Sequence, residues 1–134
     1  MAHRPSHCGL RHLALHAREF EGMRRFYTDV LGFVVEWEPD GDNVYLTSGA
    51  DNLALHRAPA AGVAPPAAGG ALDHLGLVVR RQADVDAWAD YLTGRGVALD
   101  APPRTHRDGA RSLYLSDPDG NRVQIIHHPP ISDA

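Results

Sequence analysis

The stretches LRHLALHA at residues 10–17 and LDHLGLVV at residues 72–79 decide the fold of this 134-residue chain. Both alternate between apolar and other residues. In the first, Leu13 and Leu15 point to one face, whereas His12 points to the other. The second repeats this pattern, with a histidine at the equivalent place. We therefore predict two half-buried strands, each with a histidine on its polar face.

The same series of elements follows each of these strands. In the first half, an apolar stripe predicts a helix over about 19–31, and β-branched, aromatic or aliphatic runs predict strands near 33–39, 43–48 and 52–57. In the second half, the pattern predicts a helix over about 82–95 and strands near 97–100, 111–116 and 121–127. The chain is thus predicted to be a repeat of one strand, helix and three-strand module.

The repeat sets the domain organisation. We predict a single domain over 1–134, with module one at about 10–57 and module two at about 72–128. Residues 58–71 are almost entirely Ala, Pro and Gly, a composition with little to pack that is typical of a linker. Because one such module leaves a sheet face uncovered, we expect two modules to close around a cleft.

Composition narrows the functional classes. With 13 Lys and Arg against 17 Asp and Glu, the net charge of −4 argues against a surface that follows nucleic-acid phosphates. The apolar runs are far shorter than a bilayer span, and no secretory signal is expected. The single cysteine, Cys8, leaves no internal disulfide and is interpreted as incidental. We expect a cytoplasmic protein that acts on a small molecule, not on nucleic acid or membrane.

Four motifs together resemble the vicinal oxygen chelate superfamily, which includes glyoxalase I, bleomycin-resistance proteins and extradiol dioxygenases. They are the two strands quoted above, FYTDVLGF after the first helix and SLYLSDPDGNRVQI near the end of the chain. The resemblance covers roughly residues 10–128. It implies an α+β fold in which two βαβββ modules form a curled mixed sheet around a cleft, with the helices on the outer face.

The resemblance also implies a ligand set. In metal-binding members the ligands lie on the first and last strands of each module, and these places hold His12, Ala54, His74 and Gln124. Ala54 has no side-chain donor, and Gln124 stands where a glutamate is usual. A divalent metal (Fe, Mn, Ni or Zn) would therefore be held by His12, His74 and Gln124, more weakly than by a site with a carboxylate. Alternatively, the histidines are hydrogen-bonded polar side chains without metal.

Substrate-binding candidates share the cleft-facing side of the strands. Side chains two residues apart on a strand share a face, so parity directs three further histidines toward the cleft. An aromatic ligand would lie against aromatic residues of the same region. These substrate-binding candidates are His16, His56, His128, Trp37 and Tyr45.

The segment RTHRDGARSLY resembles the part of extradiol dioxygenases in which a histidine and a tyrosine contact the substrate. His106 and Tyr114 match these positions, the histidine only after a small shift. The resemblance implies that His106 moves protons and that Tyr114 donates a hydrogen bond to bound oxygen. Alternatively, Tyr114 packs beside the DPDGN turn, and His106 lies in a mobile loop after Pro102 and Pro103.

Two functions from different classes follow. The first is a metal-dependent, dioxygenase-like enzyme acting on a substrate with adjacent oxygens, and the histidine pair and RTHRDGARSLY favour it. The second is a metal-free small-molecule binding or drug-resistance protein, which the missing carboxylates favour. A glyoxalase-type isomerase is less attractive, because neither Ala54 nor Gln124 can act as its carboxylate base. The resemblance also implies a homodimer in which modules pair within or between chains.

Overall fold

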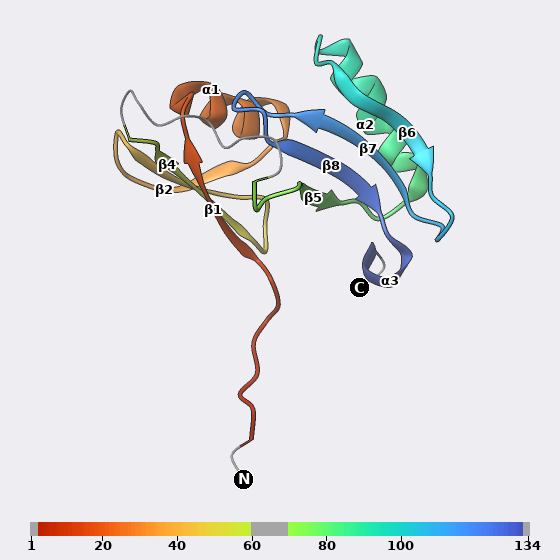
Figure 1. The fold of residues 1–134 in the computed structure, drawn as a ribbon, viewed down its shortest axis with the longest axis horizontal. Helices are drawn as coiled ribbons and strands as arrows, with labels where there is room; N and C mark the ends of the chain where they lie inside the picture. Colours follow the sequence, from red (N-terminus) through yellow and green to blue (C-terminus); the bar gives the residue numbers. More distant parts are fainter. Residues whose placement is uncertain (1–2, 60–69, 133–134) are drawn as a thin grey trace. The chain divides into compact units, whose positions relative to one another are not determined.

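The computed structural model describes residues 3–59 and 70–132 and divides the chain into two compact units, Met1–Ala61 and Gly62–Ala134. Residues 60–69, the greater part of the predicted linker, lie outside the described residues. Each unit contains one four-stranded mixed sheet with few helices, and neither sheet closes into a barrel (Figure 1). No helix of the described residues is long and apolar enough to cross a membrane.

The first unit follows the predicted order of elements. They are β1 (His12–Ala17), α1 (Phe20–Arg25), the π-helix η1 (Phe26–Val30), β2 (Val34–Asp40), β3 (Asn43–Thr47) and β4 (Asn52–Arg57). The strand order in the sheet is β1-β4-β3-β2, in which β1 and β4 are parallel and the other pairs are antiparallel. Parallel pairing of the first and last strands leaves the helix as the crossover between β1 and the antiparallel part of the sheet.

One face of this sheet is apolar and carries the core. Val44 and Leu46 are fully buried there, on the side of β3 opposite Tyr45, and fully buried Leu55 of β4 is paired with Val44. The helical segment contacts β4 and contributes Met23 and Tyr27, both fully buried. The opposite face of β1 and β3 is left open.

The second unit repeats the arrangement. Its elements are β5 (Leu75–Val78), α2 (Gln82–Gly94), β6 (Leu99–Thr105), β7 (Arg111–Ser116), β8 (Arg122–His127) and the short α3 (Pro129–Ser132). The strand order is β5-β8-β7-β6, again with the first and last strands parallel. The α+β class and the two βαβββ modules are therefore confirmed.

Helix α2 covers the apolar face of the second sheet. It packs against β6, β7 and β8 (Figure 1). Its residues Val85 and Leu92 are fully buried. Leu113, Leu115 and Ile125 supply the buried side chains of the strands. Burial of this apolar surface is the main source of the unit's stability, and it fixes which face of the sheet stays open.

Several predicted boundaries differ from those observed. The first strand begins at His12, because Leu10 is almost wholly exposed and cannot anchor it. The predicted helix over 19–31 is α1 continued by η1, and it ends where Gly32 adopts a φ of +84°. The sixth strand extends to Thr105, beyond the predicted 97–100, and contains two prolines. An edge strand accepts proline, and register shifts interrupt its pairing with β7 there.

Candidate functional site

The open face of the first sheet gathers the predicted histidines of that unit. In the parallel pairing of β1 with β4, His12 lies opposite Asn52 and His16 lies opposite His56. Between these pairs lies a pair of alanines, one of them Ala54. His12 and His16 are exposed, whereas the intervening leucines are partly buried on the other face of β1. Of these two alanines, Ala14 is exposed and Ala54 is fully buried.

A hydrogen-bond chain anchors His12. Its Nδ1 lies 2.7 Å from Oδ1 of Asn52, and Nδ2 of Asn52 donates to Oε2 of Glu36 at 2.8 Å. An ionised carboxylate only accepts hydrogen bonds, so the amide nitrogen must face Glu36 and the amide oxygen must face the ring. Nδ1 of neutral His12 therefore carries the proton, and Nε2 carries the lone pair.

A second chain of the same kind anchors His56. Its Nδ1 lies 2.6 Å from Oδ1 of Asn43, whose Nδ2 donates to Asp40 at 2.9 Å and 3.2 Å. The same reasoning assigns the proton of neutral His56 to Nδ1 and the lone pair to Nε2. Backbone N–H donation from Asp42, with the Asn43 amide second, lowers the pKa of Asp40 and keeps its carboxylate ionised.

Aromatic side chains extend the open face across three strands. Trp37 stacks on Tyr45 with ring centroids 5.1 Å apart and an interplanar angle of 25°. Tyr45 in turn meets the edge of His56 at 5.8 Å. Trp37 remains 59% exposed, which leaves one ring face available to a ligand. The predicted substrate-binding residues Trp37, Tyr45 and His56 thus lie in one row.

Tyr114 of β7 and Gln124 of β8 lie opposite each other in the second sheet, and His74 directly precedes β5, which begins at Leu75 and not at the predicted residue 72. His74 and Tyr114 meet edge to face at 5.6 Å, and Nε2 of Gln124 donates to the Tyr114 hydroxyl at 3.0 Å. The hydroxyl is therefore an acceptor toward Gln124 and keeps its own proton for another partner. Gly76 lies opposite Gln124, and a Cβ there would stand 3.8 Å from Oε1 of Gln124. The absent side chain leaves this oxygen uncovered on that side.

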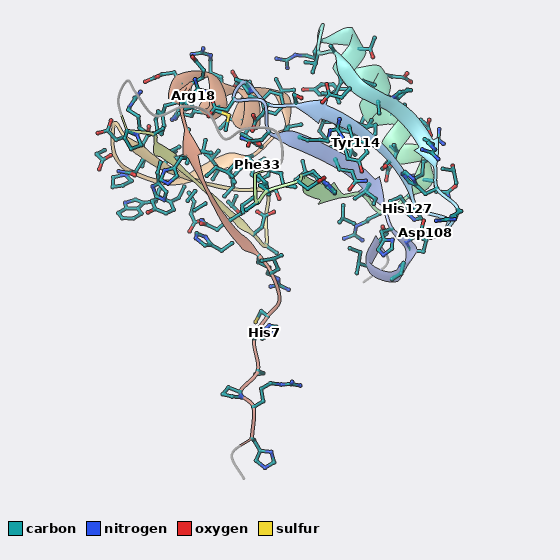
Figure 2. The ribbon with its side chains drawn as sticks, in the orientation of Figure 1. His7, Arg18, Phe33, Asp108, Tyr114 and His127 are labelled. Carbon is teal, nitrogen blue, oxygen red and sulfur yellow. The ribbon has the colours of Figure 1, made fainter. Side chains whose placement is uncertain are left out.

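Charged residues contact both His74 and Tyr114. Nδ1 of His74 donates to Oδ1 of Asp73 at 2.7 Å, and this hydrogen bond is the main reason that the pKa of Asp73 is lowered. His74 thus has the same tautomer as His12, with its lone pair on Nε2. The guanidinium of Arg122 lies over the Tyr114 ring, 5.1 Å from its centroid. Figure 2 marks Tyr114 on β7 of this unit.

His106 directly follows β6 and lies in the short turn of residues 106–110 that leads to β7, as the loop alternative for this histidine predicted. Both prolines lie within β6, and the backbone N–H of His106 donates to the carbonyl of Ala110 at 2.7 Å. The ring Nε2 lies 2.8 Å from Oγ of buried Ser112. Ser112 and Tyr114 share the open face of β7 by alternation.

His16 and His128 are less constrained. No described residue hydrogen-bonds to the His16 ring. His128 follows the end of β8, and its backbone carbonyl accepts hydrogen bonds from Ile131 and Ser132 in the turn that begins α3. Its neighbour His127 ends β8 (Figure 2). The structure therefore places His16 on the first sheet and His128 just beyond the second.

The donor set fits a divalent cation in its chemistry, although it lacks a carboxylate. His12 and His74 each have Nδ1 hydrogen-bonded to a neighbouring oxygen, the arrangement found at metal-ligating histidines. Gln124 offers an amide oxygen, whereas Ala54 offers no side-chain donor. Within residues 3–59 and 70–132, no group of three or more His, Cys, Asp or Glu side chains is gathered as a metal site.

Sequence reasoning missed the residues that orient the histidines. Asn52 and Asn43 hold His12 and His56, and Asp73 holds His74. Asp73 could have been found, since it directly precedes its histidine. The asparagines become partners only through the strand register, because 40 residues separate Asn52 from His12 and 13 separate Asn43 from His56.

Comparison with known proteins identifies the family of the chain. The model of the Glyoxalase/Bleomycin resistance protein/Dioxygenase superfamily matches residues 9–125. The chain is 30% identical over 133 residues to a catechol-2,3-dioxygenase of Bacillus subtilis (strain 168), covering 97% of the chain and 44% of that protein. The chain thus spans less than half the length of this curated relative.

Solved structures support the same fold. A lactoylglutathione lyase from Agrobacterium tumefaciens superposes with a TM-score of 0.72 at 24% identity, covering 89% of this chain and 92% of that one. A glyoxylase/bleomycin resistance protein/dioxygenase domain from Frankia sp. EAN1pec gives a TM-score of 0.74 at 22% identity, with 91% and 98% covered. The chain therefore belongs to the glyoxalase, bleomycin-resistance protein and dioxygenase superfamily, also called the vicinal oxygen chelate superfamily.

Proposed function

We propose that the protein is a metal-dependent, dioxygenase-like enzyme acting on a small molecule with adjacent oxygens. One observation carries this proposal: His12 and His74, at equivalent places of the two modules, are both anchored through Nδ1 and both present Nε2. A merely solvated histidine needs no fixed tautomer, whereas a ligand does. The match to a catechol-2,3-dioxygenase supports the reaction class.

The proposed metal ligands are Nε2 of His12, Nε2 of His74 and Oε1 of Gln124. Two imidazoles and an amide oxygen suit iron, manganese, nickel or zinc, but they supply no negative charge. When bound, such a cation would chelate adjacent substrate oxygens and lower the energy of charge that develops on them. Without a carboxylate, the affinity of the site should be low and metal occupancy should depend on supply.

The chain's own residues would then orient the substrate and handle protons. Because Gln124 donates to the Tyr114 hydroxyl, the Tyr114 O–H is directed to another acceptor, which we propose is a substrate oxygen. We propose that the His106 ring, which Ser112 holds by a hydrogen bond at Nε2, exchanges a proton with the substrate. Trp37 and Tyr45, with His16, His56 and His128, complete the proposed substrate-binding set. We also propose that the protein is a homodimer.

Oxygen consumption tests the reaction class. Protein loaded with iron(II) or manganese(II) is mixed with catechol in an oxygen electrode, with His7→Ala as a control because His7 lies on the extended segment before β1 (Figure 2). Ring opening adds both atoms of one dioxygen to one catechol, so uptake should be stoichiometric and should be lost in His74→Ala. Absence of uptake with either metal would refute a catechol-cleaving activity.

A second function is favoured by the row of aromatic residues. Trp37 and Tyr45 form a stacked surface that can hold an aromatic ligand with no metal, and Ala54 and Gln124 depart from the full ligand set. A drug-binding or resistance protein would use the same open faces without chemistry. Such a protein would bind its ligand with an affinity that chelator leaves unchanged, and it would convert no substrate when loaded with any of the metals.

A further inference from the structure

His56 has an orientation more tightly fixed than its position on the sheet requires. The ring is half-buried on β4, and Nδ1 is held by Asn43, which is held in turn by both carboxylate oxygens of Asp40. No metal role is assigned to it, because the proposed ligands are on other strand positions. The chain of three residues nevertheless resembles the one that anchors His12 and Asn52 to Glu36.

This chain leaves Nε2 of His56 as an unshared acceptor. The amide oxygen of Asn43 cannot donate, so neutral His56 must donate from Nδ1, and its lone pair is on Nε2. None of the described residues hydrogen-bonds to Nε2. A fixed acceptor beside half-buried surface is costly to cover with an apolar group, because the lone pair would lose water without gaining a partner.

The acceptor lies at one end of an aromatic surface. The Tyr45 ring stands at 80° to the His56 ring, and the stacked Trp37 extends the surface outward. Tyr45 lies opposite Ala54, so only a methyl group occupies the neighbouring place on β4. A flat ring placed against this surface would bring a substituent on its edge toward Nε2 of His56.

We propose that His56 is a specificity-determining residue whose Nε2 accepts a hydrogen bond from a donor group on an aromatic ligand lying against Tyr45 and Trp37. Asn43 and Asp40 are positioning residues that fix the required tautomer. This inference rests on the proposed function in that both use the open face of the first sheet as a small-molecule site. His56 would favour ligands that carry a ring hydroxyl or N–H over ligands of equal shape that lack such a donor.

Phenol and anisole test the proposal, because they share a ring and differ in the donor. Each is titrated into metal-free protein containing chelator, and amide chemical shifts of the first sheet are followed by NMR. Phenol should bind about tenfold more tightly than anisole, the ratio expected for one hydrogen bond and an otherwise unsatisfied acceptor. In His56→Phe the ratio should fall to about one, whereas His7→Phe should retain it.

The phenol and anisole titrations are done without metal, so their result does not depend on the metal-dependent activity. If no oxygen uptake is found with catechol, the ratio of phenol to anisole affinity still tests the role of His56. Equal affinity for the two probes, no binding of phenol, or an unchanged ratio in His56→Phe would each overturn the inference.

The tautomer is measured separately from ligand binding. Long-range proton–nitrogen NMR of the unliganded protein at neutral pH should show His56 as the Nδ1–H form, and Asn43→Leu should shift it toward the Nε2–H form with a matching loss of phenol preference. A wild-type His56 that is mainly Nε2–H would refute the assignment even if the Asn43 variant failed to fold.

Discussion

Replacing Gln124 by glutamate would supply the carboxylate that the proposed metal site lacks. Gln124 is only 7% exposed, and its amide nitrogen donates to the Tyr114 hydroxyl at 3.0 Å. The Gln124→Glu variant therefore changes two things at once. It adds a negative charge beside the proposed cation, and it replaces a donor with an acceptor next to Tyr114.

The size of the effect follows from charge and burial. A unit charge about 4 Å from a divalent ion gains about 8 kcal/mol at an effective dielectric of 20. Coordination removes the water that the carboxylate keeps in the metal-free protein, which costs several kcal/mol and is taken as about 5. The difference of about 3 kcal/mol corresponds to an increase in metal affinity on the order of 100-fold. In the metal-free protein the largely covered carboxylate has no cation beside it, so the thermal stability of that form should fall.

Competition with a chromophoric chelator measures the metal affinity of wild type and Gln124→Glu, and calorimetry measures the unfolding of both metal-free proteins. Turnover need not rise with affinity, because the Tyr114 hydroxyl would now donate to the introduced carboxylate and not to a substrate oxygen. Unchanged or weaker metal binding by a folded Gln124→Glu protein would refute the placement of Gln124 at the metal.

Three further outcomes are expected. Asn52→Leu should lower metal affinity by about 10- to 100-fold in the same competition assay, because His12 loses the partner that orients it. Leu113→Ala should lower the free energy of unfolding in urea by about 2–5 kcal/mol, because Leu113 is fully buried under α2. The pKa of Asp86 is lowered from 3.8, mainly by its hydrogen bond to Arg111. The pair therefore stabilises the folded state above pH 3.8, and this stabilisation is lost as the pH falls through the lowered pKa of Asp86 in the folded protein. The stability difference between wild type and Arg111→Met should therefore shrink on acidification below pH 3.8.

The fold could be predicted because two independent patterns agreed. The alternation of Leu13 and Leu15 with His12 matches a half-buried strand, and its repetition around His74 identified two modules of one design. The predicted element bounds were wrong where pairing between strands outweighed the preference of single residues. Pro102 and Pro103 predicted a break, but β6 is an edge strand that accepts them.

The candidate site could be predicted only in part. Strand parity placed His12 and His16 on the face opposite Leu13 and Leu15, since a period of two decides the face of each residue, whereas Tyr114 was identified by resemblance. Parity does not fix which residues of neighbouring strands lie opposite each other. The partnership of His56 with Asn43, and the tautomer that follows from it, depends on strand register and was therefore hidden from the sequence.

The metal content of the purified protein tests the central claim most directly. Untagged protein, prepared without added metal and again after supply of iron, manganese, nickel or zinc, is measured by elemental analysis beside a His12→Ala, His74→Ala double variant. We predict near-stoichiometric metal in the supplied wild type and loss of that metal in the double variant. Absence of metal from the supplied wild type, or equal metal in both proteins, would contradict the proposed metal site.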